Sequence, residues 1–311
     1  MTGGRGQLGW ELADLLAAGG IPFWAPGHAE LDITDPRAVE AALDGHLGPV
    51  AAPGVGGPGP AGAPPTLVIN AAAFNDVDRC ETDVDRAYAE NATAAENLAV
   101  ACEGRSIPLV HVSTDFVFDG RKDSPYETTD APAPLSVYGA SKLAGEEAVR
   151  RLAKRHYIVR SSWLFGAHGR NFPRAILEAA VAGRRLRVVD DQTGSPTHAR
   201  DLAEILLRLA GVTGGAPAPY GLYHAANAGS CSRFDFAQEI LRQAGWGLPV
   251  EPMSSAELDR PARRPGYSVL SLAGLEQVGI RPPSWRQGLA DFLTKLTAME
   301  PGLFPGGGRE E

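Results

Sequence analysis

The stretch Gly3-Gly4-Arg5-Gly6-Gln7-Leu8-Gly9-Trp10, close to the N-terminus, indicates the fold more directly than any other part of the sequence. Gly3, Gly6 and Gly9 recur every three residues, and the next turns, to residue 18, carry apolar side chains at helical spacing. Glycines in such a loop permit a tight turn, a close approach of the backbone to a pyrophosphate, and close packing of the following helix. The helix N-terminus adds free N–H groups and a positive dipole end. The stretch therefore predicts a dinucleotide-binding loop at the start of an α/β domain.

A strand should precede this loop, but only Met1 and Thr2 stand before Gly3. The first strand of the predicted sheet is therefore missing from this sequence. The strands beside the gap would keep unpaired backbone groups, each costing roughly 1–3 kcal/mol if buried. We expect reduced stability or weak cofactor binding, and a recovery of NAD(P)H binding when about five apolar residues are added before Met1.

Strand-like and helical segments alternate along the rest of the chain. The expected strands are 21–25, 66–69, 108–112, 157–160, 186–189 and 222–225, and the expected helices are 9–18, 36–43, 86–102, 137–153, 172–182, 199–210 and 234–244. This alternation predicts parallel βαβ units and an α/β fold with a Rossmann-like, doubly wound parallel sheet and a smaller C-terminal substrate lobe.

The predicted domain division follows this pattern. Residues 1–162 form the NAD(P)-binding Rossmann domain, residues 163–298 form mainly the substrate-binding lobe with some segments returning to the sheet, and residues 299–311 form a disordered tail. Residues 48–65 hold six glycines, six prolines and no charge, which predicts a flexible insertion because such a segment buries too little surface to offset its ordering entropy.

Composition excludes several classes of protein. The 29 basic and 37 acidic residues give a net charge of −8, which argues against nucleic acid or an anionic membrane as a partner. There is no apolar run of about 18 residues and no N-terminal signal pattern, so we expect no membrane span and a cytoplasmic location. Three scattered cysteines predict reduced thiols, and no Cys or His cluster indicates a metal site. We expect a monomer or a homodimer.

A catalytic pair is predicted within residues 137–153. Tyr138 and Lys142 are four residues apart, so both side chains lie on one face of the helix. A lysine ammonium stabilises a nearby phenolate, lowers the phenol pKa from about 10, and can also hold ribose hydroxyls. The strand before this helix ends in Ser113-Thr114-Asp115, at the edge of the sheet where ligands bind. The hydroxyl of Thr114 is expected to hold a substrate carbonyl for hydride attack.

Cofactor contacts are predicted at two further places. The expected strand 21–25, which would come second in the sheet after the missing one, is followed by Gly27-His28 rather than by an acidic residue. This allows NADPH as well as NADH, with Arg5 as a candidate partner of the 2′-phosphate. Asp32 and Ile33 are expected over the adenine. The segment Asn70-Ala71-Ala72-Ala73 leaves room for a flat cofactor, although Asn70 also fits a purely structural role.

Taken together, these residues resemble the extended short-chain dehydrogenase/reductase superfamily and, within it, the dTDP-4-dehydrorhamnose reductase family. The resemblance covers residues 3–292. Its most specific strings are Ser113-Thr114-Asp115-Phe116-Val117-Phe118 and Asp191-Gln192-Thr193-Gly194-Ser195-Pro196-Thr197, and Tyr138 to Glu146 and Arg160 to Gly166 also match. The missing first strand and the Gly/Pro insertion depart from the family.

The resemblance implies a role for each matching residue. Tyr138 would donate a proton, Lys142 would tune it and hold the ribose, and Thr114 would position the carbonyl. Gly3, Gly6, Gly9, Gln7, Leu8 and Ala71 to Ala73 would contact NADPH or NADH, while Thr114, Asp115 and Trp163 would face a nucleotide sugar, with a core aromatic as the plain alternative for Trp163. The implied reaction reduces the 4-keto group of dTDP-4-dehydro-L-rhamnose. Magnesium is implied by the resemblance alone, with no ligands identified.

Three alternatives remain open. Another deoxysugar 4-ketoreductase or a sugar-nucleotide epimerase would use the same residues. A dehydratase is disfavoured because Phe116, rather than a second carboxylate, follows Asp115. A non-catalytic, NADP-binding regulatory subunit would not need Tyr138, Lys142 and Thr114, yet all three are present.

Overall fold

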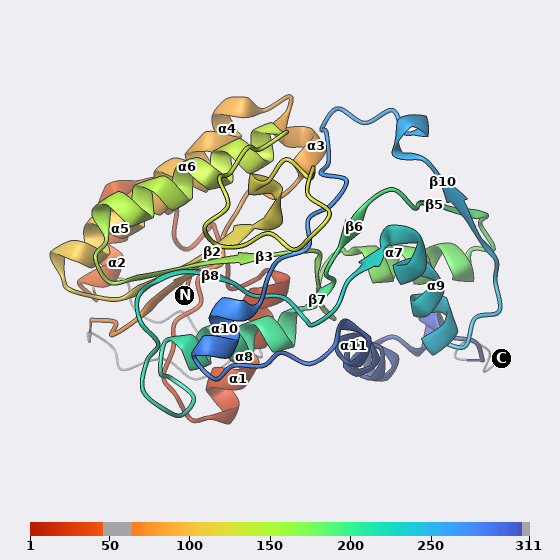
Figure 1. Cartoon of the computed structure of the whole chain (residues 1–311). Coiled ribbons are helices and arrows are strands. Elements are labelled where there is room, and N and C mark those ends of the chain that lie inside the picture. The colour runs from red at the N-terminus through yellow and green to blue at the C-terminus, as the bar shows by residue number, and fades with distance from the viewer. Residues whose placement is uncertain (46–63, 307–311) are drawn as a thin grey trace.

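The computed structural model describes residues 1–45 and 64–306 (Figure 1). A parallel sheet with helices on both faces lies beside a smaller part built around α7 (Phe172–Val181), α9 (Arg233–Gln243), β5 (Leu186–Val189) and β10 (Val250–Met253). The predicted α/β class and doubly wound parallel sheet are confirmed.

The main sheet has four strands in the order β1 (Val68–Asn70), β2 (Leu109–Thr114), β3 (His156–Ser161) and β8 (Gly221–His224). All three pairings are parallel, with Asn70 opposite His111 and Thr114 opposite Ser161. The carboxyl ends of these strands therefore share one edge, and this edge faces the smaller part of the molecule (Figure 1). Every residue of β1 is buried, and nearly all of β2 and β3 is buried too, as expected for strands covered on both faces.

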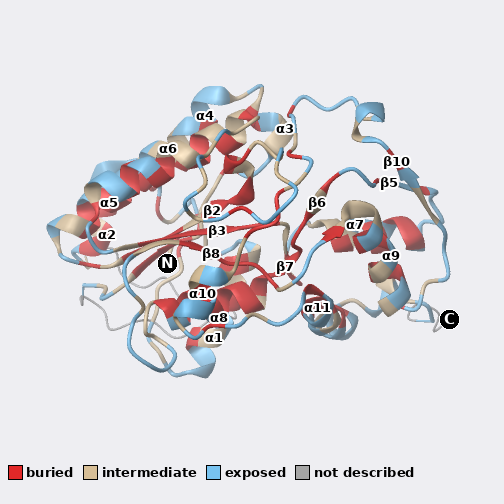
Figure 2. Cartoon of the chain, viewed as in Figure 1, coloured by how far each residue is buried: buried red, intermediate tan, exposed pale blue. Residues whose placement is uncertain are grey.

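Helices cover both faces of the sheet, with their buried sides turned inward (Figure 2). On one face, α1 (Gln7–Ala18) packs against α8 (Ala199–Leu209), and their leucines enclose a core with Ile69, Val110 and Tyr157. On the other face, α2 (Pro36–Leu43), α5 (Ala94–Gly104) and α6 (Val137–Leu152) enclose a core with Val68 and Leu109. Alternate side chains of the strands thus pack into two separate apolar cores, one on each face of the sheet.

The smaller part has its own core. Phe165, Phe236 and Phe292 pack against one another there, and the fully buried Trp285 closes the cluster. The remaining elements are α3 (Val77–Cys80), α4 (Val84–Tyr88), the π-helix η1 (Ala89–Thr93), the 3₁₀ turns η2 (Asp115–Val117), η3 (Ser255–Glu257) and η4 (Pro301–Leu303), β4 (Leu164–Phe165), β6 (Thr193–Gly194), β7 (Thr197–His198), β9 (Cys231–Ser232), α10 (Ala273–Gln277) and α11 (Trp285–Met299).

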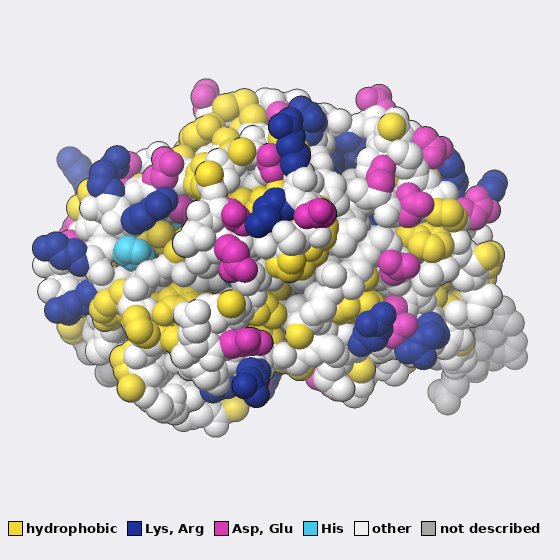
Figure 3. All heavy atoms as spheres, viewed as in Figure 1, with side chains coloured by type: hydrophobic (Ala, Val, Ile, Leu, Met, Phe, Trp, Pro, Cys, Tyr) yellow, Lys and Arg dark blue, Asp and Glu magenta, His cyan; other side chains and the backbone are white. Residues whose placement is uncertain are grey.

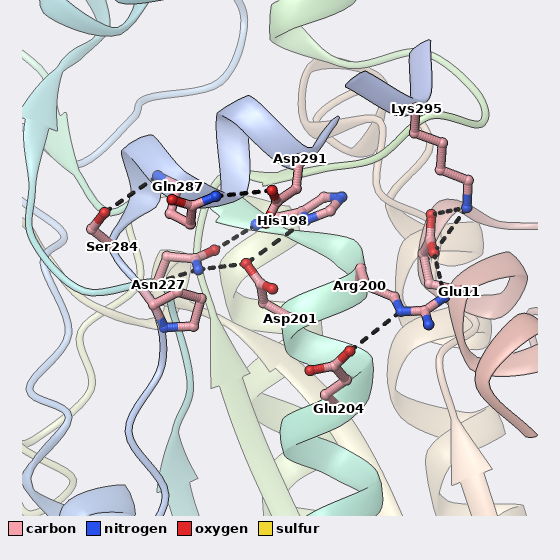
Figure 4. A network of polar contacts seen from close by, with 11 residues as sticks. Glu11, His198, Arg200, Asp201, Glu204, Asn227, Ser284, Gln287, Asp291 and Lys295 are labelled. Atoms are coloured by element: carbon pink, nitrogen blue, oxygen red, sulfur yellow. Dashed lines mark hydrogen bonds and ion pairs between the residues drawn. The ribbon is translucent and has the colours of Figure 1, made fainter. Parts of the chain in front are cut away.

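A polar network connects α11 with α1 and α8 (Figure 4). Lys295 donates to both carboxylate oxygens of Glu11, at 2.9 Å and 3.1 Å, and Glu11 is only 1% exposed. Arg200 lies 3.7 Å from the same carboxylate and 2.8 Å from Asp14. The buried charge of Glu11 is therefore neutralised from two helices, which fixes α11 against the sheet domain.

On the face shown in Figure 3, basic and acidic side chains are interspersed.

Two expectations about local structure are wrong. Residues 21–25 do not form a strand: only Phe23 makes an isolated bridge, and Pro22 has no N–H to donate. The expected disorder of residues 299–311 does not hold for residues 301–306, because η4 forms there, Trp246 donates to the Leu303 carbonyl at 3.1 Å, and Phe304 packs on the core of the smaller part. Most of the predicted insertion, residues 48–63, lies outside the described residues, as do 307–311.

Candidate active site

The glycine loop leads directly into α1. Gly3 has a φ of +69°, and a Cβ there would lie 2.7 Å from the backbone of Ala71 and Ala72. The Gly6 N–H donates to the Gly3 carbonyl at 2.9 Å, which closes the turn. Since α1 has neither a side-chain N-cap nor an acidic residue in its first turn, its first N–H groups are available to an anion. The loop is a cradle that a side chain would fill and that a pyrophosphate fits.

The end of β1 lies opposite this loop. Asn70, which is 2% exposed, accepts hydrogen bonds from the Thr2 hydroxyl at 2.7 Å and the Ala72 N–H at 3.2 Å, and its amide lies 3.1 Å from Nδ1 of His111. Asn70 therefore has a structural role, which was the alternative considered for it from the sequence. It holds the backbone of residues 71–73 against Gly3, so the two predicted cofactor segments are brought together.

The other predicted cofactor residues have mixed surroundings. Leu8 and Ile33 are buried in the two cores, so only their backbones are open to a ligand. The carboxylate of Asp32 accepts from the N–H and the hydroxyl of Thr34, at 2.9 Å and 2.7 Å. Gln7 accepts from Asn171 at 3.0 Å and thereby contacts the smaller part.

An acidic residue that the sequence prediction missed lies shortly after residues 21–25. Glu30 forms an ion pair with Arg5 at 2.6 Å and accepts a hydrogen bond from the Gly27 N–H. The Gly27 N–H, followed by Arg5, holds the pKa of the Glu30 carboxyl below its usual value. Arg5, the expected partner of a 2′-phosphate, is thus engaged by a carboxylate. The signal in the sequence was the acid three residues after Gly27.

The predicted catalytic residues meet at the carboxyl end of β2. Thr114 ends that strand, and Tyr138 lies in the first turn of α6, which Ser136 caps by accepting from the Gly139 N–H. There is no room for a Cβ at Gly139 beside the Phe116 carbonyl, so the helix lies directly against the turn that follows Thr114. Burial raises the pKa of Tyr138 above its usual value, and a hydrogen bond with the Thr114 side chain partly opposes this shift.

Lys142 lies one turn further along α6 and is 2% exposed. Its ammonium donates to the Val112 carbonyl at 2.7 Å. Burial lowers the pKa of Lys142 to about 8, while the charge of Glu146 opposes the shift. The expected lowering of the Tyr138 pKa by the lysine is therefore not found: burial dominates and the shift has the opposite sign.

A buried ion pair beneath α6 was not predicted. Arg160 of β3 binds Glu146 of α6 through two of its nitrogens, at 2.9 Å and 2.6 Å, and both side chains are at most 2% exposed. The hydroxyl of Ser113 donates to the same carboxylate. Because Glu146 lies four residues after Lys142, this cluster fixes the helix face that carries both predicted catalytic side chains.

The predicted substrate residues form a second cluster beside Thr114. The Asp115 carboxylate is 1% exposed and accepts from Ser268 at 2.6 Å and from Thr114 at 3.1 Å, and burial raises its pKa to about 6. Trp163 has a positive φ of 47°, an uncommon conformation for a bulky residue. The guanidinium of Arg233 lies 3.6 Å from the centre of the Trp163 ring.

Arg233 and Ser268 were missed because nothing local marks them. Burial lowers the pKa of Arg233 to about 10, while the charge of Asp115 opposes the shift. Within the part of the chain that the structure describes, no carboxylate lies within ion-pair distance of Arg233. The cluster thus combines one buried carboxyl, whose two oxygens accept from Thr114 and Ser268, with one cation stacked on an indole ring.

Residues 1–45 and 64–306 contain no group of three or more His, Cys, Asp or Glu side chains arranged to hold a metal ion. In the same ranges no helix has the length and apolar character needed to cross a membrane.

Comparison with known proteins gives consistent matches over nearly the whole chain. Residues 1–298 match the model of a family described as the RmlD substrate binding domain. The chain is 41% identical over 302 residues to a dTDP-4-dehydrorhamnose reductase of Mycobacterium tuberculosis, covering 94% of this chain and 91% of the relative.

Solved structures agree with this match. A dTDP-4-dehydrorhamnose reductase of Clostridium acetobutylicum superposes with a TM-score of 0.85 at 35% identity, covering 95% of this chain and 98% of the other. One from Bacillus anthracis, in complex with NADP, gives a TM-score of 0.84 at 35% identity, covering 94% and 97%.

Proposed function

The chain belongs to the RmlD substrate binding domain family, and from this premise we propose that it reduces the 4-keto group of dTDP-4-dehydro-L-rhamnose with NAD(P)H to give dTDP-L-rhamnose. It is an NAD(P)H-dependent oxidoreductase that acts on a nucleotide sugar. The observation that carries the proposal is the meeting of Thr114, Tyr138 and Lys142 at the carboxyl edge of the sheet.

The reaction needs a hydride at C4 of the sugar and a proton at its oxygen. NAD(P)H supplies the hydride when it is bound. The hydroxyl of Thr114, which donates to Asp115 in the structure, would turn to donate to the 4-keto oxygen and hold it in place. Tyr138 transfers its phenolic proton to the same oxygen as negative charge develops there. A phenol whose pKa is raised by burial is protonated at neutral pH, which fits a proton donor.

Lys142 supports this transfer electrostatically. Its ammonium is held by the Val112 carbonyl at 2.7 Å, one helical turn from Tyr138. A positive charge in this buried place stabilises the phenolate that remains after proton transfer. The same ammonium would also donate to the ribose hydroxyls of the cofactor. The pyrophosphate would rest on the first N–H groups of α1 beside Gly3.

Asp115 and Arg233 are assigned to the substrate. The Asp115 carboxyl, beside Thr114, would accept from a sugar hydroxyl, and Arg233 would donate to an anionic group such as the diphosphate. Trp163 would offer its ring to the ligand while it holds the guanidinium on its face. In this proposal Asp115, which binds the sugar, is the residue next to Thr114, which polarises the carbonyl.

Oxidation of NADPH on addition of dTDP-4-dehydro-L-rhamnose tests the proposal, followed as the loss of nicotinamide absorbance. Tyr138→Phe should lower kcat by roughly 10²- to 10⁴-fold, whereas Tyr220→Phe, at a tyrosine 46% exposed, should leave kcat unchanged. Turnover with other 4-keto deoxysugar nucleotides but not with this one would assign a different 4-ketoreductase. Equal kcat for Tyr138→Phe and the native chain would refute the proton-donor role.

A further inference from the structure

A segment of the chain runs from the smaller part of the molecule to the sheet domain after β10. It leaves η3, passes beside α3 and then reaches α10, as the blue trace in Figure 1 shows. Residues 262–268, the strap, form the middle of this segment. Ala262 and Ser268, at the two ends of the strap, are both buried. The strap is therefore packed against other parts of the molecule at both ends, and both contacts lead to the candidate site.

Arg264 fastens the strap to α3 through a two-pronged ion pair. Its two terminal nitrogens donate to the two carboxylate oxygens of Asp78, at 3.1 Å and 2.8 Å. The Ala262 N–H donates to the same carboxylate at 3.2 Å. The hydrogen bonds from Arg264 hold the pKa of the Asp78 carboxyl below its usual value, so the carboxylate is charged at neutral pH. A planar guanidinium bound in this way fixes both the distance and the orientation of its partner.

One path of contacts leads from Asp78 to Tyr138. Asp78 belongs to α3, and Glu81, which follows that helix, accepts a hydrogen bond from the Val137 N–H at 2.9 Å. Val137 is the first residue of α6 and Tyr138 is the second. Cys80 of α3 also belongs to the apolar cluster against which Tyr138 packs. A displacement of α3 would therefore move the start of α6 and the phenol ring with it.

A second path leads along the strap to Thr114. The strap lies directly on the turn after η2, because a Cβ at Gly120 would be 2.6 Å from the strap backbone. At the end of the strap the Ser268 hydroxyl donates to one oxygen of Asp115 at 2.6 Å, and the Thr114 hydroxyl donates to the other at 3.1 Å. A displacement of the strap would therefore disturb the surroundings of Thr114.

The two paths meet at the ion pair between Arg264 and Asp78. Arg264 is 17% exposed and Asp78 is 35% exposed, so the pair is partly shielded from water. α3 has four residues, and so short a helix has little stability of its own. Its position depends on contacts such as this one. The ion pair thus joins the elements that carry the two groups assigned to the 4-keto oxygen, Tyr138 and Thr114.

We propose that Arg264 is a positioning residue for the reduction: through Asp78 it holds the phenol of Tyr138 at the distance from Thr114 that lets both groups donate to one carbonyl oxygen. This inference rests on the proposed reductase function, because it concerns the two donors of that reaction. A displacement of about 1 Å at such a site can lower the rate about 10²-fold. The pyrophosphate cradle at Gly3 belongs to neither path, so cofactor affinity should be spared.

Arg264→Ala removes the ion pair, and Arg263→Ala, at the exposed neighbouring arginine of the strap, is the matched control. With NADPH and dTDP-4-dehydro-L-rhamnose, Arg264→Ala should lower kcat about 10- to 100-fold and change the KM for NADPH less than about 3-fold. The primary isotope effect with NADPH deuterated at the transferred hydrogen should rise, because hydride transfer becomes slow relative to product release. Arg263→Ala should change none of these values.

Chemical rescue separates positioning from general stability. Ethylguanidinium should restore part of the kcat of Arg264→Ala, whereas ethylammonium at the same concentration should not, because only the planar ion donates to both oxygens of Asp78. The double variant Asp78→Asn with Arg264→Ala should have a kcat no lower than Arg264→Ala alone, since both changes break one contact.

The amide of Val137 reports the first path without any turnover. Its hydrogen exchange should become at least about tenfold faster in Arg264→Ala and stay unchanged in Arg263→Ala, because the bond to Glu81 loosens when α3 is released.

Two results would overturn the proposal. One is a kcat and an isotope effect in folded Arg264→Ala equal to those of the native chain, even with a lower Tm, since the ion pair would then only stabilise the fold. The other is unchanged exchange at Val137, since the path from Asp78 would then not reach α6. A native chain without turnover, but with faster exchange at Val137 in Arg264→Ala, would refute the reductase function and support the path from Arg264 to α6.

Discussion

Replacing Glu146 with glutamine should destabilise the fold far more than the same replacement at the exposed Glu96. The carboxylate binds Arg160 at 2.9 Å and 2.6 Å, and the two side chains are 1% and 2% exposed. Removing one partner of such a pair leaves a buried charge uncompensated, which costs roughly 3–5 kcal/mol. Glutamine keeps one acceptor oxygen, so we expect a loss near 3 kcal/mol, or a fall in Tm of about 5–10 °C.

The matched control is Glu96→Gln. Its partner Arg151 lies 3.3 Å away, but the side chains are 66% and 48% exposed. Exposed pairs contribute at most about 1 kcal/mol, so Tm should change by no more than about 2 °C. Thermal unfolding followed by circular dichroism compares the two variants. The double variant Glu146→Leu with Arg160→Met should recover much of the stability, because no unpaired charge remains.

The same substitution should also affect activity, through Lys142. The Glu146 charge opposes the lowering of the Lys142 pKa, so its removal should lower that pKa further below about 8. The fall of kcat/KM at high pH should then move to lower pH in Glu146→Gln. A fall in Tm of 1 °C or less, or an unshifted pH profile in a folded variant, would refute this account of the buried pair.

Three further predictions concern the site. The kcat/KM of the native chain should fall as pH rises through about 8, where Lys142 loses its proton, and a pH–rate profile that is flat from pH 7 to 9 would contradict this. Asp115→Asn should raise the free energy of unfolding by ~1–3 kcal/mol at pH 7.5 but little at pH 4, because the cost of the buried carboxylate builds up from its usual pKa of 3.8 and is complete above the raised pKa of about 6; denaturant unfolding at the two pH values measures the difference. Arg233→Met should raise the KM for the nucleotide sugar ~10- to 100-fold while kcat changes less than ~3-fold, and Arg242→Met, an exposed arginine on the same helix, should change neither in steady-state assays.

The local pattern of the sequence predicts much of the fold. The expected strand 186–189 and the expected helices that begin at residues 36, 137 and 199 correspond closely to β5, α2, α6 and α8. The start of α2 is the most exact of these, because Asp35 caps the helix and Pro36 opens it. Residues 21–25 fail because a strand also needs a paired neighbour, which a local pattern does not reveal.

The candidate site also has residues that local spacing predicts and residues that it does not predict. Thr114, Tyr138 and Lys142 are found by spacing, since a strand end and one helix face bring them together. Contacts between distant segments leave no such mark: Ser268 is 153 residues from Asp115. The shift in the Tyr138 pKa was predicted with the wrong sign because a sequence shows the neighbouring lysine but not the degree of burial.

The link between Glu11 and Lys295 bears on how the protein is made. The two residues are 284 positions apart, and the carboxylate is 1% exposed in the finished fold. During synthesis α1 leaves the ribosome long before α11. At that stage Glu11 lacks its lysine partner, and its carboxylate remains hydrated. The packing of α1 on the sheet is therefore completed only when the last helix arrives. Nascent chains stalled before residue 285 should be open to proteases around α1, and those that include α11 should resist them.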